Sequence, residues 1–197
     1  APGRTACSNS IAGPSAPCDI VGIVGNDLFG IGDTLTEDPA IRFDEVPRFP
    51  PECFASLHNT TPSNYKRFRD GLAQLLQEGV VQAFENPHAF QKIPLLGAVG
   101  PLQFEIVQYR LESEYGATSR LEPEAWTLAR WIAAGPNAEA DLILPQGSRR
   151  VLDAQGRPVL LFVDDWARRY FQEKNPDLRL AELPDATPDG VSAAVGV

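Results

Sequence analysis

Two amphipathic helices, each lying between short apolar segments, constrain the fold of this chain more than any other feature. The first helix has an apolar face formed by Tyr65, Phe68, Leu72, Leu75 and Leu76. The second has an apolar face formed by Phe104, Val107, Leu111 and Tyr115. Apolar residues three or four positions apart share one side of an α-helix, so both helices are predicted to pack on a sheet.

The residues around these helices define their ends and the strands between them. Thr61-Pro62 predicts an N-cap followed by Pro at the first helical position, and Gly79 predicts the end of this helix. Gly100-Pro101 and Gly116 bound the second helix in the same way. Segments typical of strands lie at 53–58, 80–84, 94–99, 117–121 and 127–133. The order from residue 52 is β-α-β-β-α-β, which predicts an α+β fold with a ferredoxin-like split βαβ sheet.

The last third of the chain adds a hairpin, a helix and a strand to this prediction. The hairpin joins residues 150–153 to 159–163. Asp164 or Asp165 can cap a third helix, and Asn175-Pro176 stops it. The apolar residues of this helix are Trp166, Ala167, Tyr170 and Phe171, and a final strand is expected at 178–183. Residues 184–197 are rich in small residues and are predicted to be a disordered tail.

The N-terminal quarter has a different composition. Residues 1–17 are rich in Ala, Gly, Pro and Ser without apolar periodicity and are predicted to be a loop or a frayed end. Short strands are predicted at 18–24, 28–31 and 41–46. Three short strands cannot bury a core alone, so they are interpreted as the end of a larger β unit. The predicted division is therefore 1–48 for the incomplete β unit, 49–183 for the α+β domain and 184–197 for the tail.

Composition excludes several classes of function. The chain has 17 Lys and Arg against 26 Asp and Glu, a formal charge of −9, which opposes general attraction to a polyanion or an anionic membrane. Charge or Pro interrupts every apolar segment, so no membrane span is predicted. Three Cys without a CxxC spacing and two His give no zinc-ligand pattern, and the odd Cys count favours a reducing cytosol.

Catalytic motifs are absent from the sequence. It contains no G-x-x-x-x-G-K-[ST] phosphate loop, no G-x-S-x-G, no H-E-x-x-H and no G-x-G-x-x-G. Gly97 and Gly100 lie beside strands, where turns and close backbone packing explain them better than phosphate binding. We therefore predict no catalytic, cofactor-binding or metal-binding residue in this chain.

Basic residues are concentrated in the middle of the chain. Residues 53–110 contain five basic and four acidic residues, whereas the segments on either side are net negative. With the apolar face of the first helix turned inward, Lys66 and Arg67 project outward, and Arg168 and Arg169 are expected to point away from the aromatic residues of the third helix. Each pair is either a solvated helix face or a contact for RNA phosphates.

Several longer motifs resemble a known family. Residues 19–23 and 31–37 are similar to the closing strands of the barrel domain of translational GTPases. PRFPPECF at 47–54, GLAQLLQEGVVQAF at 71–84 and GAVGPLQFEIV at 97–107 resemble the bacterial peptide chain release factor 3 family, and RLESEY at 110–115 and ARW at 129–131 extend the match. Elongation factor G has a looser version of the glycine–helix junction, so the resemblance depends on GLxQL, EGxxQ and AVGxLQF.

This resemblance implies a role in translation termination. Members of that family use GTP to remove stop-codon release factors from the ribosome. The chain then looks like a C-terminal fragment, with the last barrel strands and a third domain, whereas the GTPase domain with its GTP and Mg²⁺ sites would precede it. The implied partners are the ribosome (small subunit and rRNA), the factor's own GTPase domain and, indirectly, the stop-codon release factors. The implied place is the cytoplasm, and Lys66, Arg67, Arg168 and Arg169 are the expected ribosome contacts.

A second interpretation stays open at this point. A ferredoxin-like domain can also sense a small molecule or dimerise through its sheet edges. Such a module needs a polar pocket at the junctions of helices and strands, where the sequence offers only Gly97 and Gly100.

Overall fold

The strands in the described part of this chain form a sheet of two strands and a sheet of eight. The structure is a computed structural model, which describes residues 5–6, 34–38, 40–41, 49–87, 93–133 and 142–184. The chain divides into two units, residues 1–47 and residues 48–197, which are described separately below.

The first unit contains the two-stranded sheet. Strand β1 (Thr5–Ala6) pairs in parallel with β2 (Thr34–Leu35). The prediction of an unpaired segment over 1–17 is therefore wrong at residues 5 and 6, because a ladder made by backbone groups needs no apolar periodicity. The strands predicted at 18–24 and 28–31 lie outside the described residues, as does the strand at 41–46 apart from Ile41, which is in no strand.

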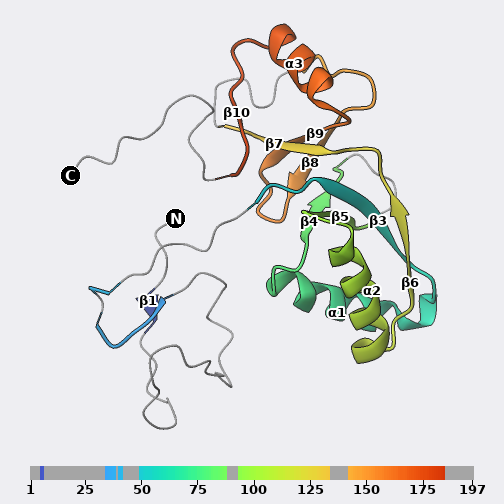
Figure 1. The fold of residues 1–197 in the computed structure, drawn as a ribbon. Helices are drawn as coiled ribbons and strands as arrows, with labels where there is room; N and C mark the ends of the chain where they lie inside the picture. Colours follow the sequence, from blue (N-terminus) through green and yellow to red (C-terminus); the bar gives the residue numbers. More distant parts are fainter. Residues whose placement is uncertain are drawn as a thin grey trace. The chain divides into compact units, whose positions relative to one another are not determined.

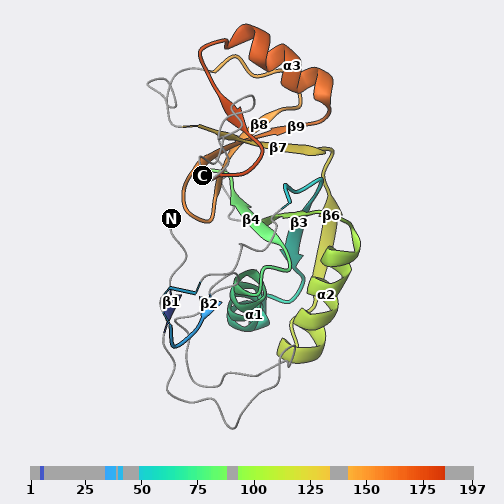
Figure 2. The ribbon, with the colours of Figure 1, turned by 60° about the vertical axis from the view of Figure 1, so that its left-hand side comes forward.

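The second unit begins with the predicted order of strands and helices. Its first elements are β3 (Cys53–Asn59), the short 3₁₀ helix η1 (Pro62–Asn64), α1 (Tyr65–Gln77), β4 (Gln82–Glu85), β5 (Leu95–Ala98), α2 (Leu102–Tyr115) and β6 (Ser119–Pro123). The four strands lie in the order β4-β5-β3-β6 and all neighbours are antiparallel. Helices α1 and α2 lie on one side of these strands (Figures 1 and 2).

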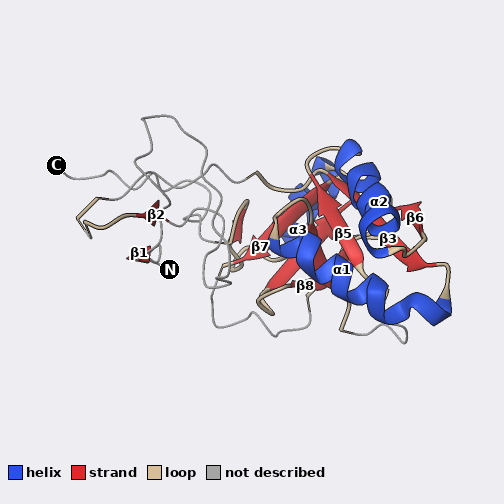
Figure 3. Ribbon diagram, turned by 90° about the horizontal axis from the view of Figure 1, so that it is seen from below, coloured by secondary structure: helices blue, strands red, loops and turns tan. Residues whose placement is uncertain are grey.

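The remaining elements extend the same sheet. They are β7 (Leu128–Ile132), β8 (Arg149–Asp153), β9 (Pro158–Phe162), α3 (Asp165–Lys174) and β10 (Leu180–Ala181). Strand β8 pairs with β4, which places Phe84 opposite Asp153 and gives the order β10-β7-β9-β8-β4-β5-β3-β6. The unit is thus α+β, with an antiparallel sheet and three α-helices in its described residues (Figure 3). Of the predicted tail at 184–197, residues 185–197 lie outside the described part of the chain.

The core is built in layers because neighbouring strand residues point to opposite sides. Ala55 and Leu57 of β3 face α1 and α2, whereas Phe54 faces a second cluster shared with β7, β8 and β9. In β9, Leu161 belongs to this second cluster and Phe162 packs instead with Phe171 of α3, at 5.6 Å between ring centroids. The second cluster therefore lies between two halves of the sheet, β4-β5-β3-β6 and β10-β7-β9-β8. Helices α1 and α2 cover the other side of the first half, and α3 covers the other side of the second (Figure 1).

The predicted apolar face of α1 is wrong at its first residue. Phe68, Leu72 and Leu75 are buried as predicted, but Tyr65 is exposed. The buried side of the helix includes Gly71 instead, where an added Cβ would lie 2.6 Å from the ring of Tyr115 on α2. Close packing against this glycine turns the helix so that Tyr65 is left at the edge of its buried face.

The predicted face of α3 is also partly wrong. Ala167 and Phe171 are buried, but Trp166 is 69% exposed and stacks on half-buried Tyr170 at 5.5 Å. Four aromatic and small residues cannot all face one core, since positions 166 and 171 are 140° apart on a helix. Trp126 and Trp131, by contrast, are buried in the second cluster.

Candidate RNA-contact surface

The two basic residues predicted to project from α1 do so in the structure. Lys66 and Arg67 are exposed, and neither makes an ion pair with another described residue. Asp70, four positions after Lys66, is instead held by Arg69, whose Nη2 lies 3.0 Å from its Oδ1. The charges of Lys66 and Arg67 are therefore not compensated by the described part of the chain.

These residues lie where two connections meet. The segment 59–69 links β3 to α1, and the segment 115–121 links α2 to β6; we call their joint surface the basic end. Thr60 Oγ1 lies 2.8 Å from Thr118 Oγ1, and Thr61 Oγ1 lies 2.9 Å from the same atom. The Thr60 backbone N–H also donates to the Thr118 carbonyl at 3.2 Å. Three hydroxyl groups are thus gathered beside the start of α1.

The end of α2 fixes the geometry of the second connection. Gly116 has φ of +63°, the left-handed conformation that favours glycine, and the Ala117 N–H donates back to the Leu111 carbonyl at 2.9 Å. This turn presents the Gly116 carbonyl to Asn64, whose Nδ2 donates to it at 3.0 Å. Asn64 therefore ties the start of α1 to the end of α2. Thr61 stands at the N-cap position of η1 with Pro62 as its first residue, as predicted, but its side chain makes no capping hydrogen bond and its hydroxyl contacts Thr118 instead.

The charge of the basic end differs from that of the whole chain. Its two segments contain Lys66, Arg67, Arg69 and Arg120 and no Asp or Glu, in a chain with a formal charge of −9. Arg120 is 3.5 Å from Glu122, just beyond the segment. Lys and Arg side chains together with Thr hydroxyls and Asn amides are the groups that contact nucleic-acid phosphates. The basic end therefore gathers the kinds of group that contact a phosphate backbone.

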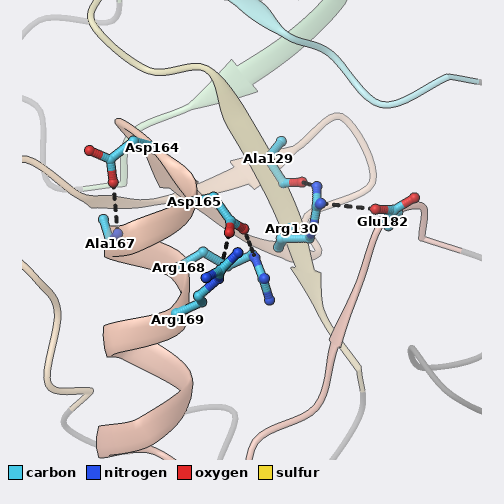
Figure 4. Close-up of polar contacts among 8 residues, drawn as sticks. All are labelled: Ala129, Arg130, Asp164, Asp165, Ala167, Arg168, Arg169 and Glu182. Carbon is cyan, nitrogen blue, oxygen red and sulfur yellow. Dashed lines mark hydrogen bonds and ion pairs between the residues drawn. The ribbon is translucent and has the colours of Figure 1, made fainter.

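The second predicted basic pair has a different environment (Figure 4). The carboxylate of Asp165 lies between the two arginines, with Oδ1 2.7 Å from Arg168 Nε and Oδ2 2.6 Å from Arg169 Nε. The hydrogen bond from Arg168 lowers the pKa of Asp165, so this carboxylate is charged at neutral pH. Asp164 caps the helix by accepting from the Ala167 N–H at 2.8 Å. One carboxylate thus offsets part of the charge of Arg168 and Arg169.

The structure does not bring the two basic pairs into one site. Lys66 and Arg67 are on α1, which packs on the β3–β6 half of the sheet, whereas Arg168 and Arg169 are on α3, which packs on the other half. Sequence reasoning missed the contact among the three Thr hydroxyls, because Thr118 is 58 residues from Thr60 and 57 from Thr61. The sequence marks this region only by its run without Asp or Glu, 53–69, and gives no local signal for the contact with Thr118.

The buried acidic residue of this unit has a structural role. Asp153 accepts from Trp131 Nε1 at 2.9 Å, from Arg157 Nε at 2.7 Å and from two backbone N–H groups of its own turn. Burial raises the pKa of Asp153, but the hydrogen bonds from Trp131 and Arg157 outweigh it, so the pKa is lowered. Every oxygen has a partner, and Asp153 therefore fixes the β8–β9 turn to β7.

The described residues offer few other sites. They include no group of three or more His, Cys, Asp or Glu placed to hold a metal ion. No described helix is both long and apolar enough to span a bilayer. At Gly97 an added Cβ would lie 2.7 Å from the ring of Phe84, so this glycine allows close packing, as the sequence predicted.

Comparison with known proteins identifies the family. The family model described as class II release factor RF3, C-terminal domain, matches residues 43–172. The chain belongs to the RF3 C-terminal domain family. Proteins named peptide chain release factor 3 are similar to it: 43% identical over 84% of the chain in Gloeobacter violaceus, 42% over 85% in Microcystis aeruginosa and 40% over 85% in Gloeothece citriformis. The resemblance drawn from the motifs is thus confirmed.

The matches cover most of this chain but only part of each relative. The chain covers 31% of the length of each of these three relatives. The matched segment of the RF3 C-terminal family runs from the end of the first unit through β3–β9 and most of α3. It therefore includes both Lys66 and Arg67 and both Arg168 and Arg169.

Proposed function

We propose that this chain acts in translation termination as the ribosome-docking part of a release factor 3-type protein. In such a protein a GTPase domain N-terminal to these residues would use GTP and Mg²⁺ to remove stop-codon release factors. The family membership supports this role, and the absence of a phosphate loop from the sequence supports a chain without catalysis of its own. Its place of action would be the cytoplasm.

The proposal includes a finer description of the fold. Residues 53–123 form a ferredoxin-like unit within the third domain, 49–183, and residues 1–48 are the end of a translation-factor β-barrel. The antiparallel order β4-β5-β3-β6 with α1 and α2 on one face supports the first part. The third domain would contact the factor's own GTPase domain and the small ribosomal subunit.

The observation that carries the docking proposal is the composition of the basic end. Lys66 and Arg67 are exposed and make no ion pair with a described residue. They lie in segments that contain no carboxylate and that also carry the three Thr hydroxyls. An acidic protein that approaches rRNA needs such a local cationic surface, because its overall charge opposes the approach. Arg168 and Arg169 would contribute less, since Asp165 lies against both.

Sedimentation with salt-washed ribosomes tests this proposal. In the 197-residue chain, Lys66→Gln with Arg67→Gln should lower ribosome affinity about tenfold and make its salt dependence shallower by about one to two in logarithmic slope. Arg168→Gln with Arg169→Gln is the matched control, because it removes the same charge from α3. Equal losses in the two double variants, or none in the first, would contradict the role of the basic end.

The absence of catalysis has a separate test. The chain should bind neither GTP nor GDP in the presence of Mg²⁺, because no loop in its sequence can cradle phosphates. Isothermal titration calorimetry with each nucleotide measures this directly. Binding in the micromolar range would show that the nucleotide site is not confined to a preceding domain.

A further inference from the structure

Helix α2 is apolar on two opposite sides, and only one of them is used by the fold. Phe104, Val107 and Leu111 are buried against the sheet. Leu102, Ile106 and Tyr109 follow one another at intervals of four and three residues, which places them on the opposite side of the helix. All three are exposed, Leu102 by 64% and Tyr109 by 72%. A helix that covers a sheet needs one apolar face, so the second face calls for another explanation.

The second face continues into the residue before the helix. Val99 follows β5 and is also exposed. We call Val99, Leu102, Ile106 and Tyr109 the outer stripe. None of the four belongs to any of the three clusters that form the core of the described residues. The outer stripe is therefore exposed apolar surface that takes no part in the core of the described residues.

The groups beside the outer stripe are predominantly acidic. Glu105 and Glu112 lie on one flank of α2, both exposed and neither in an ion pair with a described residue. On the other flank, Arg110 is held between Glu78 and Glu114, with Nε 2.6 Å from Glu114 Oε1. That flank therefore carries two carboxylates against one guanidinium. A partner of this surface must offer apolar side chains and positive charge.

We propose that the outer stripe docks a basic protein surface, with apolar side chains of the partner on Leu102, Ile106 and Tyr109 and its Lys or Arg residues beside Glu105 and Glu112. RNA does not fit, since its phosphates would meet these carboxylates and it has no aliphatic surface to bury. One part of this inference rests on the proposed function: if the chain docks on the ribosome, the basic partner is a ribosomal protein. The same helix ends at Gly116 in the basic end, so RNA and protein contacts would lie about 10 to 20 Å apart along α2.

Site-specific photocrosslinking tests which class of molecule covers each surface. Benzophenone-bearing phenylalanine replaces Tyr109 in one variant and Lys66 in another, and both are irradiated with salt-washed ribosomes. At position 109 we expect an adduct with a basic protein that resists ribonuclease, and at position 66 an adduct that ribonuclease destroys. An RNA adduct at 109, a dimer of this chain, or an intramolecular adduct with residues 1–47 would each overturn the inference.

Failure of the inference and failure of the proposed function are separable in this experiment. An adduct at position 66 without one at 109 overturns the outer stripe alone. No co-sedimentation with ribosomes overturns the proposed function, and the outer stripe is then judged by binding to total ribosomal protein freed of RNA. Leu102→Ser with Tyr109→Ser should weaken that binding at least tenfold, and unchanged binding overturns the inference.

Matched variants control for folding and for charge. Ile143→Ser removes an apolar residue of similar exposure, 56%, outside the outer stripe and should leave binding unchanged. Glu105→Gln with Glu112→Gln should weaken binding a few-fold and reduce its salt dependence, because the partner is basic. Stronger binding by the glutamine variant would show that the partner is not basic. Thermal midpoints of all variants should stay close to that of the unmodified chain, since the changed side chains are exposed.

Discussion

Helices α1 and α3 each present two adjacent basic residues, but the carboxylates around the two pairs differ. On α3, Asp165 lies three and four positions before Arg168 and Arg169 and contacts both. On α1, the positions three and four before Lys66 are Ser63 and Pro62, and no carboxylate reaches the pair. The comparison teaches that two adjacent basic side chains keep their full charge for a partner only when the preceding helical turn contains no Asp or Glu.

The first way to test the comparison is to remove the residue that anchors each helix. Phe68 of α1 and Phe171 of α3 are both buried, so Phe68→Ala and Phe171→Ala should each lower the free energy of unfolding by about 3–5 kcal/mol. Tyr65→Ala and Trp166→Ala should cost about 1 kcal/mol or less, because both side chains are exposed. Urea denaturation followed by circular dichroism measures all four.

A large effect of Trp166→Ala would reverse this description of α3. The sequence predicted Trp166 in the core, and its stacking on Tyr170 is the only ring contact found for it among the described residues. A loss as large as that of Phe171→Ala would mean that the aromatic pair, and not Phe171, attaches the helix. The basic pair of α3 would then face a different surface.

The fold was predictable from the sequence in the segments that have a clear hydrophobic periodicity. The order β-α-β-β-α-β, the hairpin and α3 all follow from period-two and helical patterns. Tyr65 was misplaced because periodicity counts apolar residues and cannot see that Gly71 lies on the buried side. Pairing of β8 with β4, which makes one sheet of eight strands, depends on residue pairs 67 and 69 positions apart and has no local signal.

The second prediction concerns the glycine that sets the rotation of α1. Gly71→Ala should destabilise the chain by about 1–3 kcal/mol, although alanine favours helix by about 1 kcal/mol, because its Cβ would meet the Tyr115 ring. Gly100→Ala is the matched control, since nothing lies within 4 Å of the added carbon. Thermal denaturation compares the two. A more stable Gly71→Ala variant would show that α1 is not held by this contact and that Lys66 and Arg67 are not fixed by it.

The candidate site was predictable only in part. Outward projection of Lys66 and Arg67 follows from the apolar face of α1, and the structure confirms it. The hydroxyls of Thr60, Thr61 and Thr118 meet only because β3 and β6 pair, with Asn59 opposite Ser119. The ion pairs that offset part of the charge of Arg168 and Arg169 could have been predicted, because Asp165 stands at the helical spacing for ion pairs.

The third prediction uses pH to separate the two basic pairs. The pKa of Asp165 is lowered in the folded chain by the hydrogen bond from Arg168, so its contribution to stability is present above the unfolded value of about 3.9. That contribution is lost as pH falls through the lowered folded pKa. Asp165→Asn should therefore lower the thermal midpoint at pH 7, and the difference from the unmodified chain should vanish in strong acid. In an NMR titration, Arg168→Gln should raise the pKa of Asp165 toward its ordinary value, and an unchanged pKa would exclude Arg168 as its cause.

The last prediction has the smallest expected effect and tests the comparison most directly, because the variant leaves the basic pair of α3, like that of α1, without a neighbouring carboxylate. Asp165→Asn removes the carboxylate that holds Arg168 and Arg169, and ribosome affinity should then rise a few-fold at low salt, with a steeper salt dependence. Asp177→Asn changes the net charge equally, at an exposed carboxylate that makes no ion pair with a described residue, and is the matched control for general charge. An equal gain in both variants would mean that only net charge matters. If Asp165→Asn gains nothing, a basic pair without a neighbouring carboxylate is insufficient, and the Thr hydroxyls of the basic end are what distinguish α1 from α3.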